Sequence, residues 1–385
     1  MLEAVSSEVP ITGVVGVLGG TAPEVASQIE RLSDPLGARP HGVEIRADLF
    51  EGAGDALAAL AKLPRDIGTI FTVRLRDAGG RYAGSEAERV RIYREALERG
   101  AKLADAEAGT EAARELARLG APLVVSHHDC EGTPDDPSLE GLAAKLEALR
   151  PRVAKLVPTA LRTEDALRIL RWVRARGPGG PARVGFAMGP AGVASRVLAL
   201  AWGSAWTYGA FGRAAAPGMP SVEDLVRVYR AHRLTARTRI VALAGSPAGP
   251  PAVVRLVNRA LAARGLDAVC IPFEIREPAE IAAIVEELPV DVVGVAPELA
   301  ELALLAAHDE DRTARAARGA DCLRIDRKGP RPAIYAWHRL PPEAPAVARA
   351  FDLVCHVLGR DPDAEGLAAF EAEAEETEGG GPGRS

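Results

Sequence analysis

A lysine lies in the middle of an apolar segment of the 385-residue chain, where its charge is a physical problem. Lys155 is the central residue of the run VAKLV, which has the length and composition of a buried strand. Both faces of a strand in a parallel sheet are covered, so neither side-chain direction reaches bulk water. A buried lysine either finds a partner or loses its proton, and a neutral amine attacks carbonyl carbon. The alternative is that the ammonium group reaches solvent from a strand end.

Further functional side chains stand at or after the ends of other strand-like segments. Two histidines are adjacent in the segment SHHD, and because neighbouring strand residues point to opposite faces, at most one is expected to face inward. This argues against a metal site that needs both histidines. The residues at these ends are Glu44, Arg46, Asp48, Arg74, Asp105, Glu107, Ser126, His127, His128, Asp129, Met188, Ser195 and Arg196.

Strand-like and helix-like segments alternate from about residue 12 to residue 234. Eight such units in about 225 residues match the size of a closed (β/α)8 barrel, a TIM barrel of the α/β class. A doubly wound open sheet is the alternative, but the first turn, LGGT, lacks the glycine fingerprint of that fold. The expected strands cover residues 13–18, 42–47, 68–73, 103–106, 123–126, 153–157, 184–187 and 204–208.

A barrel would bring the selected side chains together, because functional groups gather at the carboxyl ends of its strands. A mouth that holds an inward lysine, a histidine and several arginines indicates Schiff-base chemistry on an anionic keto compound. Arg196, near the start of a helix, would add to the positive end of the helix dipole. Simpler interpretations stay open: Asp105 and Glu107 as structural partners of arginines, Arg196 as a surface residue, and either histidine as a hydrogen-bonded core residue.

Eight segments in order resemble type I 3-dehydroquinate dehydratase and cover nearly the whole first domain. No single segment would suffice, but the ordered set is specific. The segments are VEIRADL (43–49), FTVRLRDAGGRYAG (71–84), ADAEAG (104–109), SHHDCEGTP (126–134), AKLVPTALRTED (154–165), FAMGPAGVASR (186–196), WGSAWTYGA (202–210) and AAAPGMPSVEDL (214–225).

The resemblance implies a mechanism in the shikimate pathway of aromatic amino acid biosynthesis. Lys155 would form an imine with the C3 ketone of 3-dehydroquinate, and His128 would remove a C2 proton. The C1 hydroxyl then leaves as water, and hydrolysis releases 3-dehydroshikimate. The implied partner is this anionic keto acid, with no cofactor and no metal ion. The family's substrate-binding positions fall on Glu44, Arg46, Arg74, Met188 and Arg196, of which Arg196 matches the carboxylate clamp.

The sequence departs from the family pattern at three positions of the expected pocket. The glutamate that helps to orient or tune the histidine is replaced by Ala78, and the glutamine of the last loop by Met219. A serine before that loop is Ala215. These changes leave the imine and the base in place, but they favour a slow enzyme. Two alternatives follow: a metabolite-binding or regulatory protein that keeps the pocket, and a different lysine-imine barrel such as an aldolase.

A second β-α-β pattern follows the barrel and resembles, more faintly, the substrate-binding domain of shikimate dehydrogenase. The family's paired serines are replaced across residues 248–251, its catalytic lysine position is Leu299, and its Asn-Thr-Asp segment is replaced across residues 335–339. Dehydrogenase activity is therefore not expected, and the role of this domain in packing, dimerisation or ligand sensing stays open. The expected domains are residues 1–236, 237–360 and an acidic tail, 361–385, expected to be a frayed helix passing into disorder.

Composition excludes several other classes of function. The net charge is −6 and no basic stripe is present, so nucleic acid is not an expected partner. The four cysteines are scattered without a C-x-x-C pair, which favours reduced thiols over a disulfide framework or a zinc site. No apolar run is long enough to span a bilayer, so we expect a cytoplasmic protein that does not bind membranes. A homodimer is compatible with the sequence.

Overall fold

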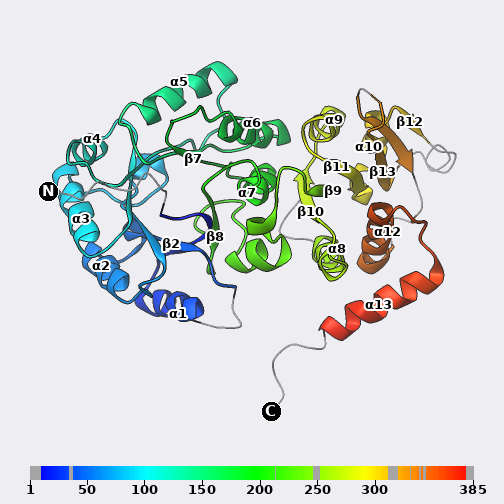
Figure 1. Cartoon of the computed structure of the whole chain (residues 1–385), viewed down its shortest axis with the longest axis horizontal. Helices are drawn as coiled ribbons and strands as arrows, with labels where there is room; N and C mark the ends of the chain where they lie inside the picture. Colours follow the sequence, from blue (N-terminus) through cyan, green and yellow to red (C-terminus); the bar gives the residue numbers. More distant parts are fainter. Residues whose placement is uncertain are drawn as a thin grey trace, which may run out of the picture. The chain divides into compact units, whose positions relative to one another are not determined.

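A computed structural model of the chain describes residues 10–33, 38–212, 214–245, 252–310, 320–329, 331–337, 340 and 344–378. The chain divides into two compact units. The first comprises Met1–Leu161 and Asp165–Thr235, and the second comprises Arg162–Glu164 and Ala236–Ser385. Each unit has its own sheet, as Figure 1 shows.

The first unit is a barrel of eight parallel strands, which confirms the fold expected from the sequence. The strands follow the order β7-β6-β5-β4-β3-β2-β1-β8, and a backbone hydrogen bond of 2.9 Å from Ala205 N to Arg183 O joins the β8 and β7 segments. Their bounds are β1 (Gly13–Leu18), β2 (Gly42–Arg46), β3 (Gly68–Thr72), β4 (Leu103–Glu107), β5 (Leu123–His128), β6 (Val153–Val157), β7 (Ala182–Gly185) and β8 (Trp206–Ala210).

Helices α1 to α6 surround these strands (Figure 1). Polar residues fix several helix starts: the side chains of Ser85, Thr110 and Asp135 each accept a hydrogen bond from a backbone N–H of the first turn. The helices are α1 (Ala22–Ser33), α2 (Ala53–Ala61), α3 (Glu86–Glu98), α4 (Glu111–Arg118), α5 (Asp136–Glu147), α6 (Thr163–Arg174) and α7 (Val193–Leu198). Short helical turns are η1 (Ala47–Leu49), η2 (Arg76–Ala78), η3 (Pro190–Gly192), η4 (Asp224–Val228) and η5 (Ala231–Arg233).

The barrel interior is a packed apolar core beneath its carboxyl-end mouth. Inward residues of the strands form one buried cluster, which includes Ile70, Val124, Val153, Val184 and Trp206. Such a core fixes the strands on which the polar residues of the mouth stand.

Three strands differ from the sequence expectation by two residues, and β2, β3 and β4 differ by one. β5 continues to His128, because its residues pair with β6 up to the pair His128–Val157. β7 begins two residues earlier than expected and β8 two residues later. The extension of β5 matters most, since it places His128 on a strand and not on a loop.

The second unit contains a mixed sheet of six strands in the order β10-β9-β11-β13-β14-β12, so the smaller α/β domain is also confirmed. β9 pairs in parallel with β10 and β11, whereas β13 is antiparallel to β11 and β14. The strands are β9 (Arg239–Gly245), β10 (Ala268–Glu274), β11 (Val290–Val295), β12 (Asp309–Glu310), β13 (Cys322–Asp326) and β14 (Ala333–Trp337). The helices are α8 (Ala252–Ala263), α9 (Pro278–Glu287), η6 (Pro297–Leu299), α10 (Ala300–Ala306), α12 (Ala346–Leu358) and α13 (Ala364–Glu378).

The acidic tail is more ordered than the sequence suggested. Helix α13 covers most of it, and Phe370 is buried with its ring centroid 5.6 Å from that of Phe351 on α12. This apolar contact anchors a helix whose exposed residues are largely acidic, which composition alone did not reveal. Residues 379–385 lie outside the described part of the chain. None of the described helices has the length and apolar character needed to cross a membrane.

Candidate active site

Seven of the fourteen side chains selected from the sequence line one cavity of about 290 Å³ at the mouth of the barrel. They come from different strands and loops, as expected for the carboxyl ends of a barrel. The residues are Glu44, Arg46, Arg74, His128, Lys155, Met188 and Arg196.

The Lys155 ammonium group is buried and has three acceptors. Its Nζ lies 2.8 Å from Asp105 Oδ2, 3.5 Å from Glu44 Oε1 and 3.1 Å from Tyr208 Oη. The residue is only 2% exposed, so the interpretation that the ammonium group reaches solvent is wrong. Three acceptors match the three N–H donors of a lysine ammonium group. The resting site therefore holds Lys155 as a paired cation.

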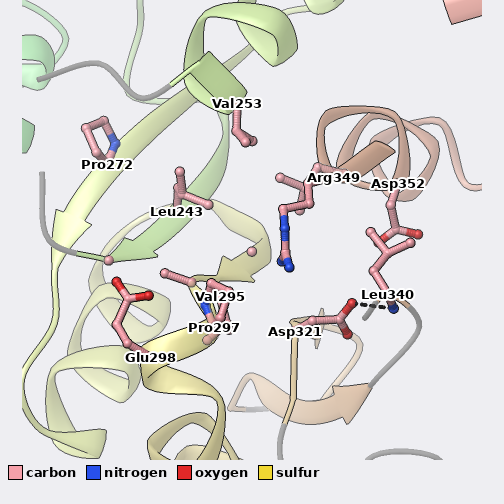
Figure 2. Close-up of a pocket in the computed structure, with 14 residues that line it drawn as sticks. Leu243, Val253, Pro272, Val295, Pro297, Glu298, Asp321, Leu340, Arg349 and Asp352 are labelled. Atoms are coloured by element: carbon pink, nitrogen blue, oxygen red, sulfur yellow. Dashed lines mark hydrogen bonds between the residues drawn. The ribbon is translucent and has the colours of Figure 1, made fainter. Parts of the chain in front are cut away.

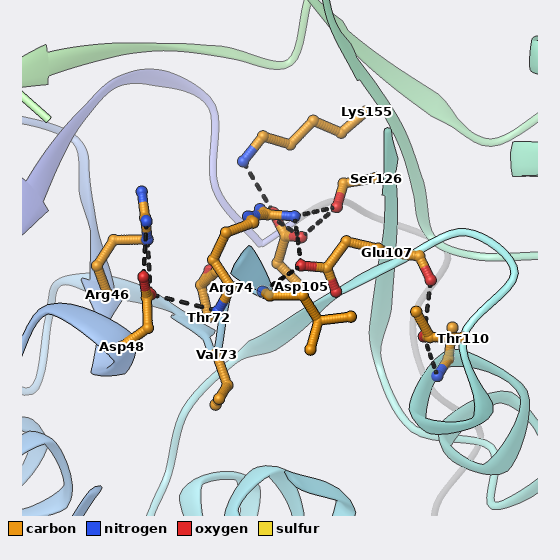
Figure 3. Close-up of polar contacts among 12 residues, drawn as sticks. Arg46, Asp48, Thr72, Val73, Arg74, Asp105, Glu107, Thr110, Ser126 and Lys155 are labelled. Atoms are coloured by element: carbon orange, nitrogen blue, oxygen red, sulfur yellow. Dashed lines mark hydrogen bonds and ion pairs between the residues drawn. The ribbon is translucent and has the colours of Figure 1, made fainter. Parts of the chain in front are cut away.

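Asp105 connects Lys155 to Arg74, as Figure 3 shows. Its Oδ1 accepts hydrogen bonds from Arg74 Nη2 (3.0 Å) and Ser126 Oγ (2.6 Å). Burial alone would raise the pKa of the Asp105 carboxyl, but the charges of Arg74 and Lys155 outweigh it and hold the pKa well below its usual value. Asp105 is thus a charged carboxylate that pairs with an arginine and also with the candidate nucleophile.

A second set of ion pairs fixes the arginines of the mouth. Arg46 donates two hydrogen bonds of 2.8 Å to Asp48, one to each carboxylate oxygen. Glu107 forms ion pairs with Arg89 and with Arg74, the latter at 3.3 Å. Arg89 was not identified from the sequence. Because bidentate pairs hold a guanidinium in one orientation, these contacts position Arg46 and Arg74 before any ligand binds.

His128 is the histidine that faces the cavity, and His127 is not among the lining residues. Burial lowers the pKa of the His128 imidazole well below its usual value, and the charges of Arg74 and Lys155 lower it further. The imidazole is therefore neutral at pH 7 and can accept a proton. Its Nδ1 is buried without a hydrogen-bond partner among the described residues.

Arg196 is a buried cation, not a surface residue. The side chain comes from α7, and the residue is 1% exposed. Within the described part of the chain, its Nε and Nη1 have no hydrogen-bond partner and no carboxylate lies within ion-pair distance. Its guanidinium carbon lies 4.6 Å from the ring centroid of Phe186. Burial lowers the pKa of Arg196 to about 9, so the guanidinium stays charged at pH 7 and the cavity favours an anion.

The three departures from the family pattern all lie at the cavity: Ala78, Ala215 and Met219 line it. In the last loop, Gly218 has a φ of 68°, and an added Cβ would lie 2.1 Å from Gly189 O. This position therefore requires glycine, and the loop keeps its shape while it presents Met219 where the family has a polar side chain.

Sequence reasoning missed several residues of the site and assigned Ser195 incorrectly. Tyr208 was not selected, although its position in β8, two residues after the inward Trp206, places it on the inner face. Phe186, Thr159 and Cys130 also line the cavity. Ser195 instead has a structural role, because its Oγ donates to Gly192 O and accepts from Ala187 N.

The second unit has a separate cavity of about 260 Å³, shown in Figure 2. Its lining is mostly apolar and contains Arg349 with several carboxylates, and the described lining residues include no lysine or histidine. Among the described residues, one group of side chains could hold a metal ion, since ligand atoms of Cys322, Asp352 and His356 lie within 4.8 Å of one another. This group is in the second unit and is not part of the Lys155 cavity.

Known proteins are similar to this chain over the barrel unit. The family model described as "Type I 3-dehydroquinase" matches residues 15–235, which is more than half of the chain. The chain belongs to this family. A 3-dehydroquinate dehydratase from Thermococcus gammatolerans is 35% identical over 187 residues, covering 47% of this chain and 83% of that protein. The crystal structure of a 3-dehydroquinate dehydratase from Geobacillus kaustophilus superimposes with a TM-score of 0.51 and 27% identity, covering 57% of this chain and 90% of the other.

One relative combines two activities in its name. The chloroplastic bifunctional 3-dehydroquinate dehydratase/shikimate dehydrogenase of Arabidopsis thaliana is 30% identical over 245 residues, which cover 59% of this chain. The match spans only 39% of the length of the Arabidopsis protein.

Proposed function

We propose that the barrel unit is a 3-dehydroquinate dehydratase that works through a Schiff base at Lys155. The observation that carries this proposal is the arrangement of three side chains around one cavity: a buried lysine, a neutral histidine and an arginine that has no counter-charge among the described residues. The family membership supports the same assignment. The reaction is the elimination of water from 3-dehydroquinate, which places the enzyme in the shikimate pathway.

The substrate carboxylate binds at Arg196 and neutralises the charge of its guanidinium. Lys155 must first lose a proton, and Glu44 is the acceptor that we propose. Asp105 is held by Arg74 and Ser126 and has a lowered pKa. Among the described residues, Glu44 accepts only a hydrogen bond of 2.6 Å from Thr72 besides the contact with Lys155. The neutral amine then attacks C3 of the substrate.

The imine acts as an electron sink for the elimination. The C3 oxygen then leaves as water, taking the proton that Glu44 received from Lys155. The positive imine nitrogen acidifies the C2 protons, and neutral His128 removes one of them. The electron pair of the C2–H bond forms an enamine, which then expels the C1 hydroxyl. His128 returns its proton to that hydroxyl, so water leaves, and hydrolysis of the imine at C3 frees Lys155 and the product. A base in this position contributes about 10²–10⁴-fold to the rate.

Borohydride reduction in the presence of 3-dehydroquinate, followed by intact mass measurement, tests the proposal. We expect a covalent adduct on Lys155 together with dehydration turnover, and neither in Lys155→Ala. Turnover at the wild-type rate in this variant would refute the scheme.

The alternative is a catalytically impaired barrel that acts as a metabolite-binding or regulatory protein. The unpartnered Nδ1 of His128 favours it, since the glutamate that orients this histidine in the family is Ala78 here. Loss of such a partner would cost about tenfold or more in rate. The same borohydride experiment distinguishes the two functions: binding of the substrate without an adduct supports the regulatory alternative.

For the second unit we propose a shikimate dehydrogenase-like substrate-binding domain without dehydrogenase activity. Leu299 occupies the position of the catalytic lysine and lies in the turn η6. The positions of the paired serines, and residues 338–339 of the third altered segment, lie outside the described residues. We expect no NADPH-dependent reduction of 3-dehydroshikimate, and measurable reduction would contradict this assignment. Our proposal also includes a cytoplasmic location, the domain limits expected from the sequence, and a homodimer that light scattering can test.

A further inference from the structure

The third partner of the Lys155 ammonium group is a tyrosine hydroxyl that the mechanism above does not use. Tyr208 Oη lies 3.1 Å from Lys155 Nζ, and Tyr208 is 2% exposed and lines the cavity. The other two partners are carboxylates, Asp105 and Glu44, which accept hydrogen bonds when charged but cannot donate them. Of the three groups in contact with Nζ, Tyr208 is therefore the one that can donate and accept at the same time.

The surrounding residues hold the Tyr208 ring in place. Phe186 and Trp206 contact it edge-on, with centroid distances of 5.7 Å and 6.4 Å. Lys155 Nζ lies 4.4 Å from the centroid of the same ring, so the lysine packs against the ring face as well as the hydroxyl. A ring packed from both sides keeps its hydroxyl near the nucleophile during the reaction.

Tyr208 is a neutral phenol under working conditions. Burial raises the pKa of its hydroxyl well above the usual value, and the charges of Glu44 and Asp105 raise it further. The hydroxyl consequently keeps its proton, and any role that it has must begin and end with a neutral tyrosine.

We propose that Tyr208 relays a proton from nitrogen to oxygen during imine formation, an inference that rests on the proposed Schiff-base function. When the Lys155 lone pair forms the C–N bond, the π electrons of the C3 carbonyl move to oxygen. Tyr208 Oη gives its proton to that oxygen and takes one from the positively charged nitrogen. The result is a neutral carbinolamine and a neutral Tyr208. All protons and electrons are accounted for, and no other reactant is needed.

The position of Oη fits this transfer. The nitrogen and the oxygen of the carbinolamine are bonded to the same carbon, so one hydroxyl can contact both of them at the same time. A direct transfer from nitrogen to oxygen would pass through a strained four-membered ring, whereas a hydroxyl between them opens the ring to six members. His128 stays free for the C2 proton, which divides the proton transfers between two residues.

Tyr208→Phe tests the relay, because it keeps the ring against Lys155 and removes only the hydroxyl. In a single-turnover experiment with 3-dehydroquinate, borohydride trapping followed by intact mass gives the rate of imine formation. We expect this rate to fall at least about tenfold, as for loss of a general acid–base group. Deuterium incorporation at C2, measured per trapped imine, should not change because it depends on His128. Tyr229→Phe is the matched control: Tyr229 is 1% exposed and is not among the residues that line the cavity.

The outcomes separate the relay from the function on which it rests. The relay is supported if Tyr208→Phe forms the trapped imine slowly, incorporates deuterium at C2 normally and has an unchanged melting temperature. Trapping at the wild-type rate in Tyr208→Phe overturns it and leaves the Schiff-base function standing. The relay is also overturned if the rate of imine trapping, the deuterium incorporation at C2 and the melting temperature all fall in this variant. That pattern indicates a structural role for the hydroxyl. If the wild-type protein forms no adduct, the proposed function itself fails, and the relay fails with it.

Discussion

Replacing Arg196 by methionine should stabilise the folded protein and abolish binding of the substrate carboxylate. The guanidinium is buried at 1% exposure, and its compensation among the described residues is the ring of Phe186 at 4.6 Å. A methionine of similar length would keep much of the packing and remove the buried charge. This trade of stability for binding is the behaviour expected of a functional residue.

The magnitude follows from the pKa of Arg196, which burial lowers far below the ordinary value of a guanidinium, to about 9. At about 1.4 kcal/mol per pKa unit, the shift corresponds to a destabilisation on the order of 5 kcal/mol. The cation–π contact with Phe186 offsets up to about 2 kcal/mol of this destabilisation. Replacement of buried ions by apolar residues commonly stabilises by about 1–4 kcal/mol, so we expect Arg196→Met to raise the free energy of unfolding by about 1–3 kcal/mol. Because the pKa is lower in the folded state, the penalty is fully present below pH 9 and shrinks as the pH rises above 9.

Urea unfolding at pH 7 measures the stability, and calorimetric titration with quinate measures the binding. Quinate has the ring carboxylate but no ketone, so it binds without forming an imine. Arg196→Lys is the control: it keeps a buried charge, so it should gain no stability. A methionine variant that is less stable than the wild type, or that binds quinate equally well, would refute the idea that Arg196 is an uncompensated carboxylate clamp.

Four further predictions concern His128, Asp105 and Met219. His128→Ala should lower kcat by about 10²–10⁴-fold but still allow borohydride trapping, and loss of trapping would contradict its role as the C2 base. Because the pKa of His128 is lowered, wild-type activity should persist as the pH falls below 6.5, and a pH–rate profile that is half-maximal at 6.5 or above would argue against this base. Asp105→Asn leaves Arg74 and Lys155 without their shared counter-charge, and urea unfolding should show a loss of about 3–5 kcal/mol; a loss below about 1 kcal/mol would contradict the pairing. Met219→Gln should lower KM by up to about tenfold through a new hydrogen bond to substrate, and an unchanged KM would mean that Met219 does not limit binding.

The sequence by itself was sufficient to predict the barrel and many of the residues at its carboxyl-end mouth. The alternation of strand-like and helix-like segments is a local pattern, and it was sufficient to predict the eight-stranded barrel that the structure has. Because parallel strands carry their carboxyl ends to one side, residues selected at those ends had to converge, whatever the detailed packing. This is why seven residues chosen without coordinates line a single cavity. The apolar neighbours of Lys155 likewise predicted its burial.

Only the tertiary structure decided which groups touch Lys155. Its partners Asp105, Tyr208 and Glu44 lie 50, 53 and 111 residues away in the sequence. These contacts depend on strand register and on barrel closure between β8 and the earlier strands, which no local pattern encodes. The same holds for His128, whose place on β5 follows from pairing with β6, and for Arg196, whose lack of a counter-charge is a property of the assembled cavity. The sequence thus identified the reacting groups, and the packing of distant segments determined their charge states and partners.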